Sequence, residues 1–247
     1  MQISKGVQRS PLKMIVYGSE GVGKSTFCAG APEPIFVDAE SGTLQIDTTR
    51  ILVNGFEHSL DAVADIIGTN YQTVIFDSAD ALEKFATKEL LVRTGWESIE
   101  TPGYGRGYAE QAETFQELLR AADALVGAGK NVVFIVHAAI QRFADPAGDS
   151  FDRWTMSTPK KISPLLSEWC DVMLFADHDR SIITKKGDFG AEKKVAKEWG
   201  ARIAFTEHRG SHDAKNRFNL PEKINLDWSV FEGHVNDFYK LKEGKKK

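Results

Sequence analysis

The chain of 247 residues is long enough for one substantial domain or at most two small ones. Its hydrophobic fraction of 42% and charged fraction of 27% are ordinary for a globular protein, which excludes a disordered or collagen-like chain. The net charge of −4 and the isoelectric point near 5.9 exclude a protein that coats nucleic acid through its whole surface, so any nucleic-acid contact would use a local patch.

The amino terminus and the cysteines indicate an intracellular protein with no membrane partner. No stretch holds the ~18 consecutive apolar residues that a membrane helix needs, and residues 1–6 lack the apolar segment of a signal peptide. Cys28 and Cys170 show neither CxxC spacing nor a disulfide framework. We therefore expect a reducing compartment.

Near-continuous apolar runs alternate with helical patterns along the first half of the chain. The predicted strands are residues 13–17, 34–38, 72–77 and 131–137, and the predicted helices are residues 59–67, 79–93 and 107–126, with another helix from Lys24. Strands rich in Val, Ile and Phe between amphipathic helices are typical of a parallel sheet buried on both faces. The sequence predicts a doubly wound α/β fold with helices on both faces of a mostly parallel sheet.

The pattern changes after His137. Residues 138–164 are rich in Pro, Asp and Ser, and a connection of this length in a compact domain is usually functional or mobile. Shorter, more polar strands are predicted at residues 171–176, 180–185, 193–197 and 201–205, as an extension of the sheet. We expect an amino-terminal tail at 1–12, one domain at 13–240, and a basic carboxy-terminal tail at 241–247.

Residues 18–25, GSEGVGKS, match the phosphate-binding pattern G-x-x-x-x-G-K-[ST] between a predicted strand and a predicted helix. The glycines allow successive backbone N–H groups to point into one anion-binding cradle, to which the helix adds its positive end. Lys24 would bridge the β- and γ-phosphates, and the Ser25 hydroxyl would ligate Mg²⁺. The predicted ATP-binding residues are Gly18, Ser19, Glu20, Gly21, Val22, Gly23, Lys24, Ser25 and Thr26.

Two acidic residues complete this predicted site. Asp77 ends the apolar run TVIFD and would hold the metal with Ser25. Glu40 lies in FVDAE, residues 36–40, and here the sequence resembles the RecA-like ATPases, whose catalytic glutamate lies in a similar stretch. By that resemblance Glu40 is the general base that polarises the attacking water. Lys24 is predicted to be a catalytic residue as well as a phosphate ligand.

Two further matches agree with the RecA-like resemblance. His137 ends the fourth predicted strand, where RecA-like proteins usually carry a polar sensor, often Gln, that links the γ-phosphate to the following DNA-binding loop. KNRF, residues 215–218, resembles the K-N-[KR] motif that RecA and RadA proteins place onto the ATP of a neighbouring subunit. The resemblance implies that Lys215 and Arg217 act in trans.

The chain most resembles the small phage-type RecA-like ATPases of single-strand annealing and recombination, over about residues 13–218. Because only 17 residues precede Gly18, it looks like a core-only version of the fold. The resemblance implies ATP and Mg²⁺ as cofactors, hydrolysis at a subunit interface, and self-association into a filament or ring. It also implies that the protein is located in the cytoplasm of a bacterial host. It also implies single-stranded DNA and a single-strand-binding protein as partners.

The segment after His137 is the predicted DNA-binding loop, because the family's loop at this place contacts single-stranded DNA. It combines cations for phosphates with aromatic rings for stacking. The predicted DNA contacts are Arg142, Phe143, Arg153, Trp154, Lys160 and Lys161. A second candidate is residues 95–107, with Trp96, Tyr104 and Arg106. Two other functions stay open: a RecA-fold hexameric helicase, and a regulatory P-loop ATPase without a nucleic-acid ligand.

Overall fold

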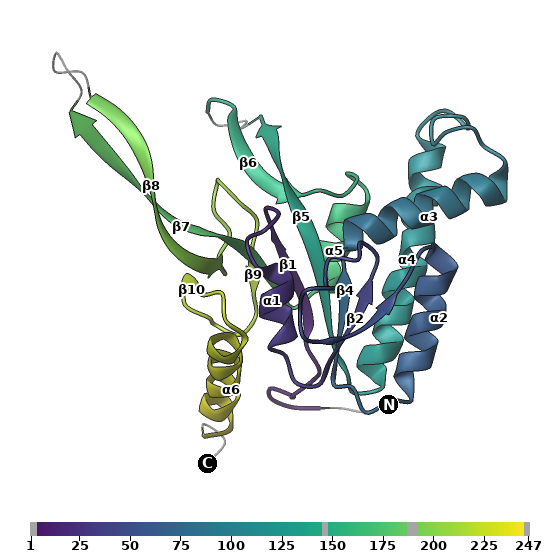
Figure 1. Ribbon diagram of the computed structural model, residues 1–247, viewed down its shortest axis with the longest axis horizontal. Helices are drawn as coiled ribbons and strands as arrows, with labels where there is room; N and C mark the ends of the chain where they lie inside the picture. The colour runs from purple at the N-terminus through teal and green to yellow at the C-terminus, as the bar shows by residue number, and fades with distance from the viewer. Residues whose placement is uncertain (1–3, 145–147, 187–191, 245–247) are drawn as a thin grey trace.

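The centre of the protein is a run of six parallel strands in the spatial order β7-β1-β5-β4-β2-β3 (Figure 1). This computed structural model describes residues 4–144, 148–186 and 192–244. The parallel strands are β1 (Lys13–Gly18), β2 (Pro34–Asp38), β3 (Thr49–Leu52), β4 (Thr73–Asp77), β5 (Asn131–Phe143) and β7 (Val172–Lys186). The predicted α/β fold is confirmed, and β3 is a strand that the sequence did not indicate.

Antiparallel strands extend the sheet at the β7 side. They are β8 (Glu192–Phe205), β9 (Lys215–Asn216) and β10 (Lys223–Asn225), and β8 pairs with β7 along most of its length. The four short strands predicted after residue 170 are in fact two long ones, with a register shift between His178 and Arg180. In the described part of the chain the sheet has ten strands.

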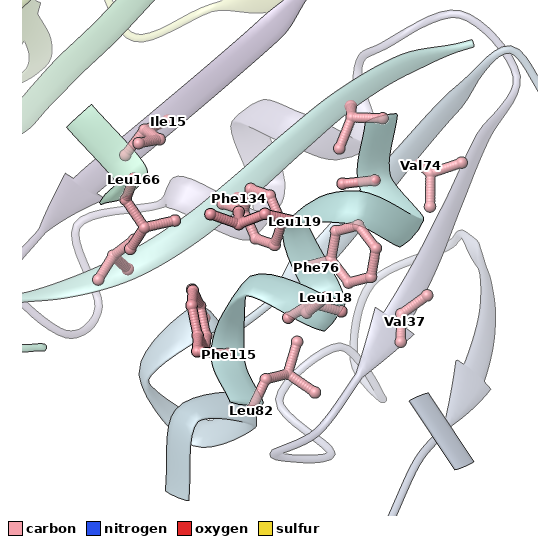
Figure 2. Close-up of a cluster of buried hydrophobic side chains, with 14 of the residues drawn as sticks. Ile15, Val37, Val74, Phe76, Leu82, Phe115, Leu118, Leu119, Phe134 and Leu166 are labelled. Atoms are coloured by element: carbon pink, nitrogen blue, oxygen red, sulfur yellow. The ribbon is translucent and has the colours of Figure 1, made fainter. Parts of the chain in front are cut away.

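Helices cover both faces of the sheet, as predicted. One face carries α2 (Phe56–Ile67), α3 (Ala79–Thr94), α4 (Arg106–Gly127) and α5 (Ile162–Trp169), and the other carries α1 (Lys24–Ala29) and α6 (Trp228–Gly244). Side chains of successive strand residues point to opposite faces of the sheet. Phe134 and Phe76 lie on the α4 face and stack at 4.6 Å between ring centroids (Figure 2). Val133 and Ile75 pack on the other face, toward α1 and α6. None of the described helices is long and apolar enough to cross a membrane.

Residues 138–164 differ from the predicted irregular connection. β5 continues to Phe143 and pairs antiparallel with β6 (Phe151–Met156), so that the two strands form a hairpin. Helix α5 follows this hairpin. The aromatic side chains of Phe143, Phe151 and Trp154 favour strands in this segment, whereas its three Pro and three Asp residues indicated a loop. Helix α6 has no counterpart among the predicted elements, and it includes residues 241–244 of the expected tail.

The hairpin β5–β6 and the longer arm β7–β8 both extend beyond the carboxyl edge of the parallel strands (Figure 1). His137 of β5 is paired with Gly18 of β1, so it marks the level at which β5 leaves the sheet. The connection between α3 and α4 projects at the same side (Figure 1). Ligands of open parallel sheets bind at this carboxyl edge, where the phosphate-binding motif also lies.

Candidate nucleotide-binding and hydrolysis site

The phosphate-binding motif forms a tight loop between β1 and α1. Gly21 and Gly23 have φ of 74° and 100°, a region that favours glycine. A Cβ on Gly18 would lie 2.3 Å from the carbonyl oxygen of Ala176 in β7, so only glycine fits between the two strands. Val22 is fully buried in the core on the α1 face and anchors the loop from inside.

Lys24 and Ser25 lie at the start of α1 and face the loop and β4, respectively. Lys24 is 6% exposed, and its Nζ donates to the carbonyl oxygens of Gly18 and Ser19, each at 2.9 Å. The Ser25 hydroxyl donates to Oδ2 of Asp77 at 2.6 Å. Burial lowers the pKa of Lys24, although the acidic groups around it act in the opposite direction.

Asp77 is a buried carboxylate at the end of β4, and burial raises its pKa to about 6. The negative charges of Asp38 and Glu40 act in the same direction, while the hydrogen bond from Ser25 opposes them. A bound divalent cation would offset this accumulation of negative charge. The hydroxyl and carboxylate oxygens of Ser25 and Asp77 are the hard ligands that Mg²⁺ prefers, so these residues fit the predicted metal site.

Glu40 is held in a turn by its neighbour Asp38. Oδ1 of Asp38 accepts the Glu40 amide at 3.0 Å, and Oδ2 accepts both the amide and the hydroxyl of Thr43, at 3.1 and 2.6 Å. Asp38 thereby fixes the backbone after β2, while the Glu40 side chain stays one-third exposed and lines the same cavity as Lys24 and Asp77. This cavity has a volume of about 300 Å³.

His137 faces Glu40 from β5 and is oriented by Asp80 in the first turn of α3. The His137 amide donates to Oδ1 of Asp80 at 3.0 Å, and Nδ1 lies 3.0 Å from Oδ2. Nδ1 also lies 4.0 Å from Oε2 of Glu40. Burial acts to raise the pKa of Asp80, yet the hydrogen bonds from His137 outweigh it and lower this pKa; the same contact raises the pKa of His137.

Two residues of the site were not predicted from the sequence. Asp80 follows the strand-end Asp77 by three residues, and an acid in the first turn of a helix is a recognisable signal. Arg202 comes from β8 and lines the cavity beside the phosphate loop: a Cβ on Gly23 would lie 2.7 Å from its Nη1. No local pattern marks Arg202, because only the pairing of β8 with β7 brings it here.

Lys215 and Arg217 lie away from the phosphate loop of their own chain. Lys215 pairs with Met173 near the amino end of β7, and its Nζ donates to carbonyl oxygens at the end of α5, among them that of Cys170 at 2.6 Å. Arg217 donates to Asp171 at 2.6 Å. Their predicted action on the ATP of a neighbouring subunit stays a prediction.

The predicted DNA-contacting residues of the hairpin have different surroundings. Arg142 and Phe143 are exposed near its end. The Arg153 side chain is only 11% exposed and pairs with Asp213 at 2.7 Å. The Trp154 ring is half-buried and packs against the main core. Arg153 and Trp154 therefore attach the hairpin to the domain, whereas Arg142 and Phe143 face solvent.

The remaining candidates lie at the base of the hairpin and between α3 and α4. Lys160 and Lys161 are exposed just before α5. In the second candidate segment the Tyr104 side chain is fully exposed, Arg106 is exposed and pairs with Glu110 four residues on, and Trp96 is half-buried.

Comparison with known proteins agrees with the fold described above. The family model described as "AAA domain" matches residues 10–218. The chain is 26% identical over 251 residues to the SPbeta prophage-derived uncharacterized protein YorG of Bacillus subtilis (strain 168), an alignment that covers 93% of this chain and 68% of the relative. The matched region contains the phosphate loop, Glu40, Asp77 and His137, and it covers most of the chain. The chain therefore belongs to this AAA-domain family of P-loop nucleotide-binding proteins.

Proposed function

We propose that this protein is a Mg²⁺-dependent ATPase of the RecA-like branch that acts on single-stranded DNA. The observation that carries the ATPase part is the convergence of Lys24, the Ser25–Asp77 pair and Glu40 on one cavity at the carboxyl edge of the sheet. A P-loop protein that only binds nucleotide does not need a carboxylate on the far side of the cavity, where it can orient water.

Each residue has a separate task in this proposal. The backbone of the loop and Lys24 bind the phosphates, and Ser25 and Asp77 hold Mg²⁺, which would neutralise phosphate charge. Glu40 orients the attacking water and accepts its proton. Asp80 holds His137 beside Glu40 through the 3.0 Å contact between Oδ2 and Nδ1. In this position the imidazole senses whether the γ-phosphate is present.

ATP hydrolysis by the unsubstituted protein and by Lys24→Ala tests this proposal. Without the mobile charge of Lys24, we expect turnover to fall at least about 100-fold, as for loss of other groups that stabilise transition-state charge. Lys13→Ala is the matched control, because Lys13 lies at the other end of β1 and pairs with Asp123. Equal turnover by Lys24→Ala and the control would refute the proposal.

The DNA part of the proposal is supported by the position of the hairpin β5–β6. The hairpin begins at His137, whose carbonyl oxygen accepts the amide of Ser157 at 2.7 Å, so both hairpin strands meet beside the nucleotide site. Arg142 and Phe143 provide an exposed cation and an exposed ring farther out. Cations beside aromatic rings are the combination that binds single strands.

A salt titration of single-stranded DNA binding separates these two contributions. Arg142→Ala should lower the salt slope by roughly 0.7 for each phosphate that the arginine neutralises. Phe143→Ala should cost ~1–3 kcal/mol of stacking and leave the slope unchanged. Arg120→Ala, on the exposed side of α4, is the control. Affinity and slope equal to the control in both variants would exclude the hairpin as the DNA site.

A further inference from the structure

A second cavity continues the nucleotide site along α1. It has a volume of about 250 Å³ and shares Gly23, Thr26 and Arg202 with the cavity that contains Lys24 and Glu40. Its other lining residues are Phe27 and Gly30 of α1 and the four residues 226–229 at the start of α6. The two cavities therefore form one groove with Arg202 at the junction.

The direction of a bound nucleotide in this groove follows from the phosphate loop. Lysine of the motif reaches the β- and γ-phosphates, while the loop backbone binds toward the α-phosphate. Lys24, Asp77 and Glu40 mark the γ-phosphate end. The opposite end, beyond Thr26, is the second cavity, and the α-phosphate and nucleoside must leave the loop there.

The second cavity has the composition of a nucleoside site. Its inner wall is aromatic: Trp228 is 4% exposed and its ring centroid lies 5.4 Å from that of Phe27. Polar groups stand at its rim, where Asp227 accepts the Ser229 amide at 2.9 Å and thereby fixes the start of α6. An apolar wall with a few fixed polar groups is typical of small-molecule sites.

Arg202 is fixed at the junction by its backbone. It is paired with His178 of β7, and its carbonyl oxygen accepts the Leu226 amide at 2.9 Å, so β8 and the loop before α6 are joined at this residue. Its guanidinium lies against Gly23, at the start of α1. A guanidinium in this place matches phosphate oxygens bound at the loop.

We propose that Arg202 binds the α- and β-phosphates in cis and that residues 226–229 with Thr26 hold the nucleoside. This inference rests on the proposed function, because it assigns the remaining part of the same ligand. It makes the carboxy-terminal elements β8 and α6 part of the nucleotide site, although their residues lie ~180–200 positions from the phosphate loop in the chain.

Two ligands with a chain of three phosphate groups, one with the nucleoside and one without it, provide the test: a non-hydrolysable ATP analogue and inorganic tripolyphosphate, each titrated with Mg²⁺ by calorimetry. Arg202→Gln should weaken both ligands about 10- to 100-fold, because charge-assisted hydrogen bonds to phosphate are removed. Arg209→Gln is the matched control, since Arg209 is half-exposed and pairs with Glu222 at 2.8 Å outside the groove.

A second variant tests the nucleoside cavity without touching the phosphate loop. Ser229→Trp fills the rim of the cavity from an exposed position and should weaken the ATP analogue at least about 10-fold while tripolyphosphate binds as before. Lys240→Trp, which adds the same ring to α6 at an exposed position outside the groove, should bind both ligands as the unsubstituted protein does. Thermal unfolding of each variant verifies that it is folded.

The outcomes separate this inference from the proposed function. Unchanged binding of both ligands by Arg202→Gln would overturn the role of Arg202. No effect of Ser229→Trp, or an equal weakening of both ligands, would overturn the nucleoside assignment. If the unsubstituted protein bound neither ligand, the proposed function itself would be refuted, and this inference with it.

Discussion

Replacing Asp77 by Asn should stabilise the protein while it removes Mg²⁺-dependent nucleotide binding. The pKa of Asp77 in the folded protein is about 6, against 3.8 for an ordinary aspartate. Each unit of this difference corresponds to ~1.36 kcal/mol, so at pH values above 6 the ionised Asp77 lowers the free energy of unfolding by about 3 kcal/mol. Asparagine carries no charge, and its side-chain oxygen can still accept the hydrogen bond from Ser25.

The sign of the pH dependence follows from which state binds the proton more tightly. The folded protein holds a proton on Asp77 up to about pH 6, and the unfolded chain only up to about pH 4, so stability falls as pH rises between these values. We therefore expect Asp77→Asn to exceed the unsubstituted protein by about 3 kcal/mol at pH 8, a rise of roughly 6–12 °C in Tm. The difference should shrink toward zero near pH 4.

Urea unfolding at pH 8, 6 and 4.5, followed by tryptophan fluorescence, measures this difference. Asp38→Asn is an informative comparison, because Asp38 is the direct neighbour of Asp77 across strands β2 and β4. There an amide nitrogen would replace an oxygen that accepts hydrogen bonds, so we expect the free energy of unfolding to fall by ~1–3 kcal/mol. Equal stability of Asp77→Asn and the unsubstituted protein at pH 8, or a gain that does not change with pH, would refute the reasoning.

Three further predictions concern turnover, assembly and the hairpin. Glu40→Gln should bind ATP as before yet hydrolyse it at least ~100-fold more slowly; loss of binding in a nucleotide titration would instead assign Glu40 a structural role. Mixing Lys24→Ala with the double variant Lys215→Ala/Arg217→Ala should partly restore ATPase activity if those cations act in trans. A cation supplied in this way raises kcat ~10³–10⁵-fold in related enzymes. No recovery of activity in proven mixed assemblies would exclude the trans arrangement. Trp154→Ala should lower the free energy of unfolding by ~2–4 kcal/mol in urea titrations, because its ring packs on the core; unchanged stability together with weaker DNA binding would contradict this.

The amino-acid sequence alone determined the parts of this protein that depend on neighbouring residues. The α/β fold followed from apolar runs that alternate with helical patterns, since strands buried on both faces need continuous apolar sequence. The conformation of the loop after β1 was predictable because its glycines, lysine and serine lie within eight consecutive residues. The position of Asp77 beside Ser25 was predictable because parallel strands bring their carboxyl ends to one edge.

Only the tertiary structure decided which distant side chains join that edge and which do not. Asp80 orients His137 because α3 starts beside β5, and Arg202 reaches Gly23 because β8 folds back along β7. Trp154, by contrast, has the residue type of a stacking platform but is half-buried against Phe175. A side chain's burial depends on strand pairing between segments far apart in the chain, and local sequence carries little information about that pairing.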